Sequence, residues 1–117
     1  MIDDPRTVTS LMEQMQGHLP MPAFATKEIV RTLRRGGVKV SVDRALLVNR
    51  VFYLGDEGGI ACDVTPRRDA KEVFVVSLTH LRVSPQHPLF RPILAYQLER
   101  VRRIAAAEQA PSARRSR

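Results

Sequence analysis

Apolar residues near the start of the chain recur at the spacing of a helix. Four of them follow the i, i+3, i+4, i+7 pattern of one helix face: Val8, Leu11, Met12 and Met15. Asp4 precedes this run as the expected N-cap, and Gly17 is expected to end the helix in a left-handed conformation. The stretch "ATKEIVRTLRRGG" predicts a second helix, with Thr26 as its cap and Gly36 at its end.

The middle of the chain has the periodicity of strands. "VKVSVD" alternates valine with polar residues, and "IACDV" and "EVFVVSLTHL" predict two further strands. The stretch "ALLVNRVFYL" is ambiguous. It fits a strand from Leu46 to Leu54, or a short helix capped by Asp43 that gives way to a strand near Arg50.

The last part of the chain predicts the longest helix, which begins near Leu89 or later because prolines surround its start. Four apolar residues of this helix follow a 4-3-4 spacing: Leu94, Leu98, Val101 and Ala105. Ile93 and Ile104 widen this stripe, by which we expect the helix to pack. Three arginines lie mostly off the stripe: Arg100, Arg102 and Arg103.

This order of elements, ααββββα, predicts an α+β fold. We expect an antiparallel sheet of three to four strands, a meander around residues 38–81, packed by two N-terminal helices and one long C-terminal helix. Because the strands do not alternate with helices, a parallel nucleotide-binding sheet is disfavoured. The 117 residues fit a single domain at 1–109, followed by a disordered basic tail at 110–117.

The glycine-rich stretch "GDEGG" lies between two of the predicted strands. Asp56 and Glu57 fit the centre of a type I turn, and Gly58 fits the left-handed position of a bulged hairpin. Two carboxylates at this turn would repel a phosphate group, which disfavours a nucleotide-binding loop. The stretch is therefore interpreted as a hairpin turn.

The register of this hairpin places Phe52 opposite Cys62 and Leu54 opposite Ile60, on the face that we assign to the core. Cys62 is therefore expected to be buried among apolar groups, which raises its thiol pKa and makes it a poor nucleophile. It is the only cysteine, so no internal disulfide can form and a reducing cytoplasm is the expected location.

His80 is the candidate ligand-binding residue nearest to this turn. If Val64 lies beside Phe74, antiparallel counting brings His80 close to Asp56 and Glu57. Carboxylate and imidazole groups can do acid–base chemistry or hold a metal, although a hydrogen-bonded or solvated strand-end histidine is the simpler interpretation. No cofactor is predicted, and the chain has no P-loop, no G-x-S-x-G elbow and no CxxC pair.

The formal net charge of +7 and the pI of about 10.7 raise the question of nucleic-acid binding. Three arginines of the tail carry part of this charge, and without them 16 basic residues stand against 12 acidic residues. A winged-helix-like arrangement of residues 27–64 is the nucleic-acid hypothesis, and it requires residues 43–49 to be helical. Its candidate contacts are five basic residues: Arg34, Arg35, Lys39, Arg44 and Arg50.

Together these observations predict a small soluble module that binds a partner or associates with itself as a homo-oligomer, without catalytic activity and without a membrane segment. Part of the sheet offers a second, partly apolar surface for such contacts: Val51, Tyr53, Ala61, Val73 and Val75. Nucleic-acid binding through residues 27–64 is one alternative. An enzyme or a metal-binding protein with a site near His80, Asp56 and Glu57 is another.

Overall fold

The computed structural model of the chain describes residues 2–66 and 73–109. These residues form three α-helices and five strands, in the order α1 (Pro5–Gln16), β1 (Met21–Ala25), α2 (Lys27–Arg35), β2 (Ala45–Tyr53), β3 (Ile60–Thr65), β4 (Phe74–Ser77), β5 (Leu81–Arg82) and α3 (Phe90–Glu108). Two short 3₁₀ turns accompany them: η1 (Gly55–Glu57) and η2 (Leu78–His80). The predicted basic tail at residues 110–117 lies outside the described residues, as does most of the predicted loop "TPRRDAK".

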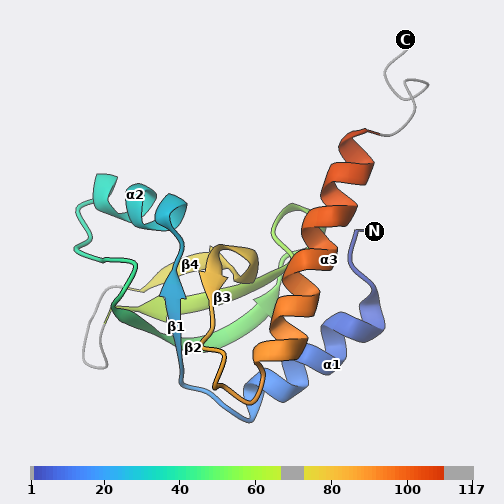
Figure 1. Cartoon of the computed structure of the whole chain (residues 1–117), viewed down its shortest axis with the longest axis horizontal. Helices are drawn as coiled ribbons and strands as arrows, with labels where there is room; N and C mark the ends of the chain where they lie inside the picture. Colours follow the sequence, from blue (N-terminus) through green and yellow to red (C-terminus); the bar gives the residue numbers. More distant parts are fainter. Residues whose placement is uncertain (1, 67–72, 110–117) are drawn as a thin grey trace.

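All five strands belong to one antiparallel sheet, in the order β4-β3-β2-β1-β5 (Figure 1). The predicted α+β class and antiparallel sheet are therefore confirmed, whereas the prediction of three to four strands is too low. Only η2 separates β4 from β5 along the chain, although these strands lie at opposite ends of the sheet order. The sheet must therefore curve until its two edges approach each other. In Figure 1, α1 and α3 lie together at one end of the sheet and α2 lies at the other.

The first helix begins where the sequence predicts. The Asp4 carboxylate accepts hydrogen bonds from the backbone N–H (3.0 Å) and the hydroxyl (2.8 Å) of Thr7, and these bonds lower the pKa of Asp4. Most of the predicted apolar face is buried: Val8, Leu11 and Met15. Gly17 follows the helix with a φ of −71°, so its expected left-handed conformation is wrong. The Gly17 N–H instead donates to the Gln14 carbonyl (3.2 Å), which ends the helix in a tight right-handed turn.

The second helix also lies in its predicted place and buries Val30 and Leu33. Thr26 takes the N-cap position with an extended backbone, but its side chain makes no capping hydrogen bond. Gly37 follows with a left-handed φ of 87°. Among the helices that the structure describes, none is long and apolar enough to cross a membrane.

Strand β1 is not among the predicted elements: Pro20 and Pro22 show that the first helix cannot continue, but they do not by themselves indicate a strand. β1 has the alternation of a strand, with three small or flexible residues buried on one face: Met21, Ala23 and Ala25. β5 pairs only with Phe24 and Ala25, so the first part of β1 is an edge of the sheet. Proline is tolerated at such an edge, where its missing N–H removes no ladder bond.

Residues 38–42 do not form the predicted strand. Val40 is buried, and Val38 and Val42 pack partly against the core, so the inward alternation itself is present. The backbone of this segment pairs with none of the described strands. The Arg34 guanidinium holds the Val40 carbonyl instead, at 3.0 Å. A loop that turns alternate side chains inward has the same sequence pattern as a strand.

Residues 43–49 are not helical, because Ala45–Tyr53 form β2. The ambiguous stretch is therefore a strand, and the second helix of a helix-turn-helix is missing from this part of the chain. The pairing of β2 with β3 shifts between Val48 and Arg50, where Asn49 forms a bulge.

The hairpin between β2 and β3 closes one residue away from the predicted register. Tyr53 lies opposite Ile60, where the prediction placed Leu54. A shift of one residue exchanges the two faces of a strand. Leu54 is therefore 51% exposed and Val51 is buried, which is the reverse of the expected arrangement.

The turn itself explains this shift. Gly58, the predicted left-handed residue, has a φ of −135°, whereas Gly55 (77°) and Gly59 (63°) are left-handed. Between them, η1 replaces the predicted type I turn at Asp56 and Glu57. The Leu54 N–H donates to the Gly59 carbonyl, so the loop is longer than the one expected.

β3 and β4 pair in the register that the sequence analysis assumed, with Val64 opposite Phe74 and Cys62 opposite Val76. β3 lies inside the sheet and is buried along its whole length. The strand predicted for "EVFVVSLTHL" is shorter than expected, because β4 ends at Ser77 and η2 turns the chain toward β5.

Candidate functional site

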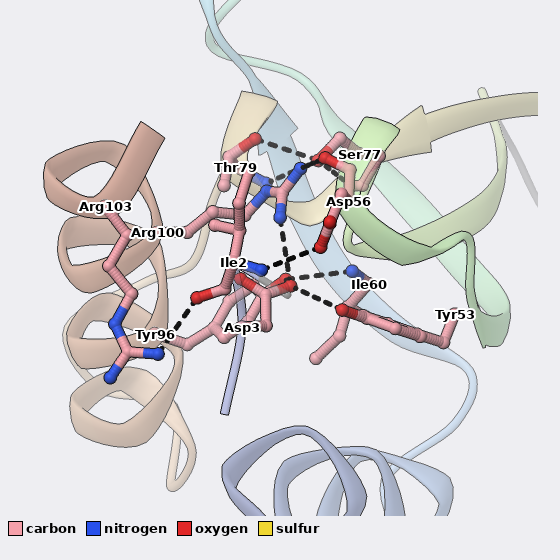
Figure 2. A network of polar contacts seen from close by, with 11 residues as sticks. Ile2, Asp3, Tyr53, Asp56, Ile60, Ser77, Thr79, Tyr96, Arg100 and Arg103 are labelled. Atoms are coloured by element: carbon pink, nitrogen blue, oxygen red, sulfur yellow. Dashed lines mark hydrogen bonds and ion pairs between the residues drawn. The ribbon is translucent and has the colours of Figure 1, made fainter. Parts of the chain in front are cut away.

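A buried ion pair joins the start of the chain to α3. Asp3 is 4% exposed and Arg100 is 3% exposed, and Asp3 Oδ2 lies 3.0 Å from Arg100 Nη1. The same oxygen accepts hydrogen bonds from the hydroxyls of Tyr53 (3.1 Å) and Tyr96 (3.0 Å) (Figure 2). These three donors compensate the carboxylate for the hydration that it loses on burial.

The network continues into the hairpin turn between β2 and β3. Arg100 Nη2 donates to the Asp56 carbonyl (2.7 Å), and the Tyr96 hydroxyl accepts a hydrogen bond from the Ile60 N–H (2.9 Å). The Asp56 carboxylate in turn accepts the N–H of Ile2 (2.7 Å). The start of the chain, the hairpin and α3 therefore meet in one set of hydrogen bonds (Figure 2).

The two tyrosines of this network remain protonated donors. Burial raises the pKa of Tyr96, and its hydrogen bond to Asp3 adds to the shift. Burial and the charge of Asp3 also raise the pKa of Tyr53. Because both folded-state pKa values lie above the ordinary value near 10, the stabilisation from these hydroxyls is fully present below about pH 10. It is lost as the pH rises further.

Gly59 allows the hairpin to close against this network. Its φ of 63° is left-handed, which favours glycine over any residue with a side chain. A Cβ at this position would meet the Tyr96 hydroxyl and would lie 2.8 Å from Arg100 Nε. Backbone conformation and close packing therefore both require glycine here.

A cavity of about 640 Å³ lies beside the network, between the hairpin turn, η2 and the first turn of α2. Glu57 and His80, which the sequence places near each other, both line this cavity. The Asp56 carboxylate is bound within the network instead. In the part of the chain that the structure describes, no three His, Cys, Asp or Glu side chains gather closely enough to hold a metal ion. A ligand held by Glu57 and His80 stays a prediction.

One polar atom in the wall of this cavity lacks a partner among the described residues. Thr26 Oγ1 is buried and makes no hydrogen bond there. The Thr26 N–H donates to the His80 carbonyl (3.2 Å), so the two residues lie side by side. Buried hydroxyls are usually hydrogen-bonded, so Thr26 Oγ1 is an exception among the buried polar atoms of the described residues.

Cys62 is completely buried in β3, as the sequence predicts. Burial raises the pKa of its thiol to about 12, and the neighbouring charge of Asp63 adds to this effect. The thiol is therefore protonated at neutral pH and unsuited to nucleophilic chemistry.

α3 turns a different face toward the body of the protein from the one that its apolar pattern predicts. Its buried residues are Ile93, Tyr96 and Arg100. The predicted packing stripe faces solvent instead, with exposed fractions of 37% for Leu94, 62% for Leu98 and 57% for Val101. The predicted packing face of α3 is wrong because Arg100 pairs with the buried Asp3, which turns the Arg100 side of the helix toward the protein. The apolar stripe lies on a different side of the helix and therefore faces solvent.

Charged residues border this exposed stripe. Glu99 accepts hydrogen bonds from Arg102 (3.0 Å) and Arg103 (2.6 Å), which lower its pKa to about 2. Arg91 and Glu108 lie near the two ends of α3, and both are exposed. The stripe therefore runs between a positive and a negative charge.

The predicted second apolar surface on the sheet is only partly present. Val73 and Val75 are exposed, together with Leu54. Val51 is buried because the hairpin register differs from the predicted one, and Ala61 is buried because β3 is buried along its whole length. These exposed side chains lie at the β4 edge and at the hairpin turn, and they do not form a long continuous row.

Four of the five predicted nucleic-acid contacts lie at one corner of the molecule. Arg34, Lys39 and Arg44 line one shallow hollow, and Arg34 and Arg35 line a second. Arg50 lies elsewhere, since its guanidinium pairs with the carboxylate of Asp63 across β2 and β3 (2.6 Å). Four of the candidate contacts therefore share one surface.

No protein-family model, curated protein or solved structure matches this chain. Proposals about its function therefore rest on its own side chains and their geometry.

We expect Gly59→Ala to destabilise the protein far more than Gly37→Ala. Both glycines have a left-handed φ, which costs an alanine about 1 kcal/mol. Only at Gly59 does the new methyl also collide with Tyr96 and Arg100, whereas nothing lies within 4 Å of a Cβ at Gly37. Urea unfolding should show a loss of roughly 3 kcal/mol for Gly59→Ala. Equal losses in the two variants would contradict the described packing.

Proposed function

We propose that this protein is a self-associating module that forms a homodimer through α3. The observation that carries the proposal is the exposed apolar row of Leu94, Leu98 and Val101 on one helix. Soluble monomers rarely leave a continuous row of large apolar side chains in water. If a second copy packs the same row against this one, both apolar rows are removed from water at once.

The spacing of this row fits the packing of two helices. Together with Ala105, the row defines what we call the α3 stripe: Leu94, Leu98, Val101 and Ala105. Its alternating steps of four and three residues are the a and d positions of a two-stranded coiled coil. All four residues are exposed, on a side of α3 other than that of Ile93 and Arg100. α3 can therefore pack against its own domain and a second copy simultaneously.

The charges at the ends of α3 favour an antiparallel pair. A register with Leu98 of one copy opposite Val101 of the other also sets Leu94 opposite Ala105. The same register sets Arg91 opposite Glu108 at both ends of the contact. A parallel pair in register would bring Arg91 against Arg91 and Glu108 against Glu108. Charge complementarity supports the antiparallel arrangement, which has the two-fold symmetry of most homodimers.

Replacing Leu98 by Glu is expected to convert the dimer into a monomer. The change sets two carboxylates near the centre of the contact and removes a large apolar side chain from each copy. We expect dimer affinity to fall on the order of 100-fold, measured by sedimentation equilibrium or light scattering over a concentration series. Leu54→Glu is the matched control, because Leu54 is similarly exposed but lies off α3. A wild-type protein that stays monomeric at millimolar concentration would contradict the proposal.

The orientation of the pair can be tested by reversing charges. We expect Arg91→Glu and Glu108→Arg each to weaken the dimer by bringing like charges together. The double variant should regain most of the affinity, because it exchanges the two charges without changing their complementarity. In a parallel dimer neither reversal changes the repulsion between like charges. Single variants with wild-type affinity would therefore exclude the antiparallel register.

A further inference from the structure

The stretch from Lys27 to Arg44 carries most of the charge imbalance of the chain. It has six basic residues: Lys27, Arg31, Arg34, Arg35, Lys39 and Arg44. Only Glu28 and Asp43 oppose them, so this stretch has a net charge of +4, against +7 for the whole chain. All six basic residues are exposed. Such a concentration of positive charge in 18 positions attracts polyanions.

The fold gathers these charges on one surface. The chain turns back after α2, with the Val38 N–H donating to the Leu33 carbonyl (3.0 Å). Arg34 Nε then binds the Val40 carbonyl (3.0 Å), which fixes the following loop beside the helix. Residues from α2 and from this loop consequently share two neighbouring hollows, with Arg34 in both. We call this surface, made by the six basic residues, the basic corner.

We propose that the basic corner binds the phosphate backbone of nucleic acid without sequence preference. A lipid surface is the other polyanion to consider, but basic segments that bind membranes also present large apolar side chains to the bilayer. The apolar residues of α2 point inward, with Val30 and Leu33 buried. None of the exposed large apolar side chains of the described residues lies between Lys27 and Arg44.

The composition of the basic corner favours phosphate contacts over base recognition. The stretch from Lys27 to Arg44 contains no Phe, Tyr, Trp or His, so it offers no aromatic ring for stacking on a base. The helix that would enter a groove is also missing, because residues 45–53 are β2. Arginine and lysine side chains remain, and these bind phosphate oxygens whatever the base sequence.

The proposed dimer would leave free the part of this surface that lies beyond the first turn of α2. The C-terminal end of α2 points away from α3, so a contact through the α3 stripe does not cover it (Figure 1). A dimer would then present two basic corners, and a nucleic acid long enough to reach both would be held by avidity. The basic corner itself does not depend on dimer formation.

The direct test measures binding to nucleic acid as a function of salt. The triple variant Arg31→Gln, Arg35→Gln, Lys39→Gln removes three charges of the basic corner and spares Arg34, which supports the loop. The matched control, Arg6→Gln, Arg82→Gln, Arg102→Gln, removes three exposed charges elsewhere. Fluorescence anisotropy would follow binding to single-stranded RNA, single-stranded DNA and duplex DNA of about 20 nucleotides.

We expect the wild type and the control to bind all three nucleic acids at low salt, with affinity that falls steeply as salt rises. The corner variant should bind at least about tenfold more weakly and lose about 2 to 3 from the slope of log K against log salt. Equal losses in the two triple variants would assign binding to net charge alone and overturn the proposal. Failure of the wild type to bind at low salt, or tighter binding to phosphatidylserine vesicles, would overturn it as well. Circular dichroism would confirm that both variants fold.

Discussion

A buried ion pair between Asp3 and Arg100 organises the packing of this protein. It joins residues 97 positions apart in the chain, and both side chains are almost entirely buried. Burying two charges is costly unless further hydrogen bonds compensate them. Here the carboxylate also receives the hydroxyls of Tyr53 and Tyr96, and the guanidinium reaches the carbonyl of Asp56 in the hairpin turn. The pair therefore positions the start of the chain, the hairpin and α3 together.

The orientation of α3 follows from this pair. Since Arg100 must face the protein to reach Asp3, the residues on the other side of the helix face solvent, and these include Leu98 and Val101. A buried polar contact thereby leaves an apolar surface exposed, which is an unfavourable arrangement for an isolated monomer. Self-association through α3 would resolve it. The same orientation shapes the nearby cavity, because Arg100 forms part of its wall beside Glu57.

Local patterns in the sequence predicted the helices and strands more accurately than the tertiary contacts between them. The Asp4 cap and the buried apolar face of α1 were predictable because a capping side chain and helix periodicity are read from neighbouring residues. The one-residue error in the β2–β3 hairpin came from a turn whose geometry depends on Gly59, which fits under Tyr96. No local pattern shows that Arg100 pairs with a residue at the opposite end of the chain, so the buried face of α3 was missed.

Asp3 and Arg100 stabilise the fold as a pair, and a double-mutant cycle measures this coupling directly. Asp3→Asn, Arg100→Met and the double variant would be unfolded in urea, all in the Leu98→Glu background so that association does not contribute. Breaking a buried pair leaves one uncompensated group, so each single change should cost about 3 kcal/mol or more. The double change should cost much less than the sum, which gives a coupling free energy of at least about 2 kcal/mol. Additive losses, with a coupling near zero, would show that Asp3 and Arg100 do not stabilise the fold as a pair.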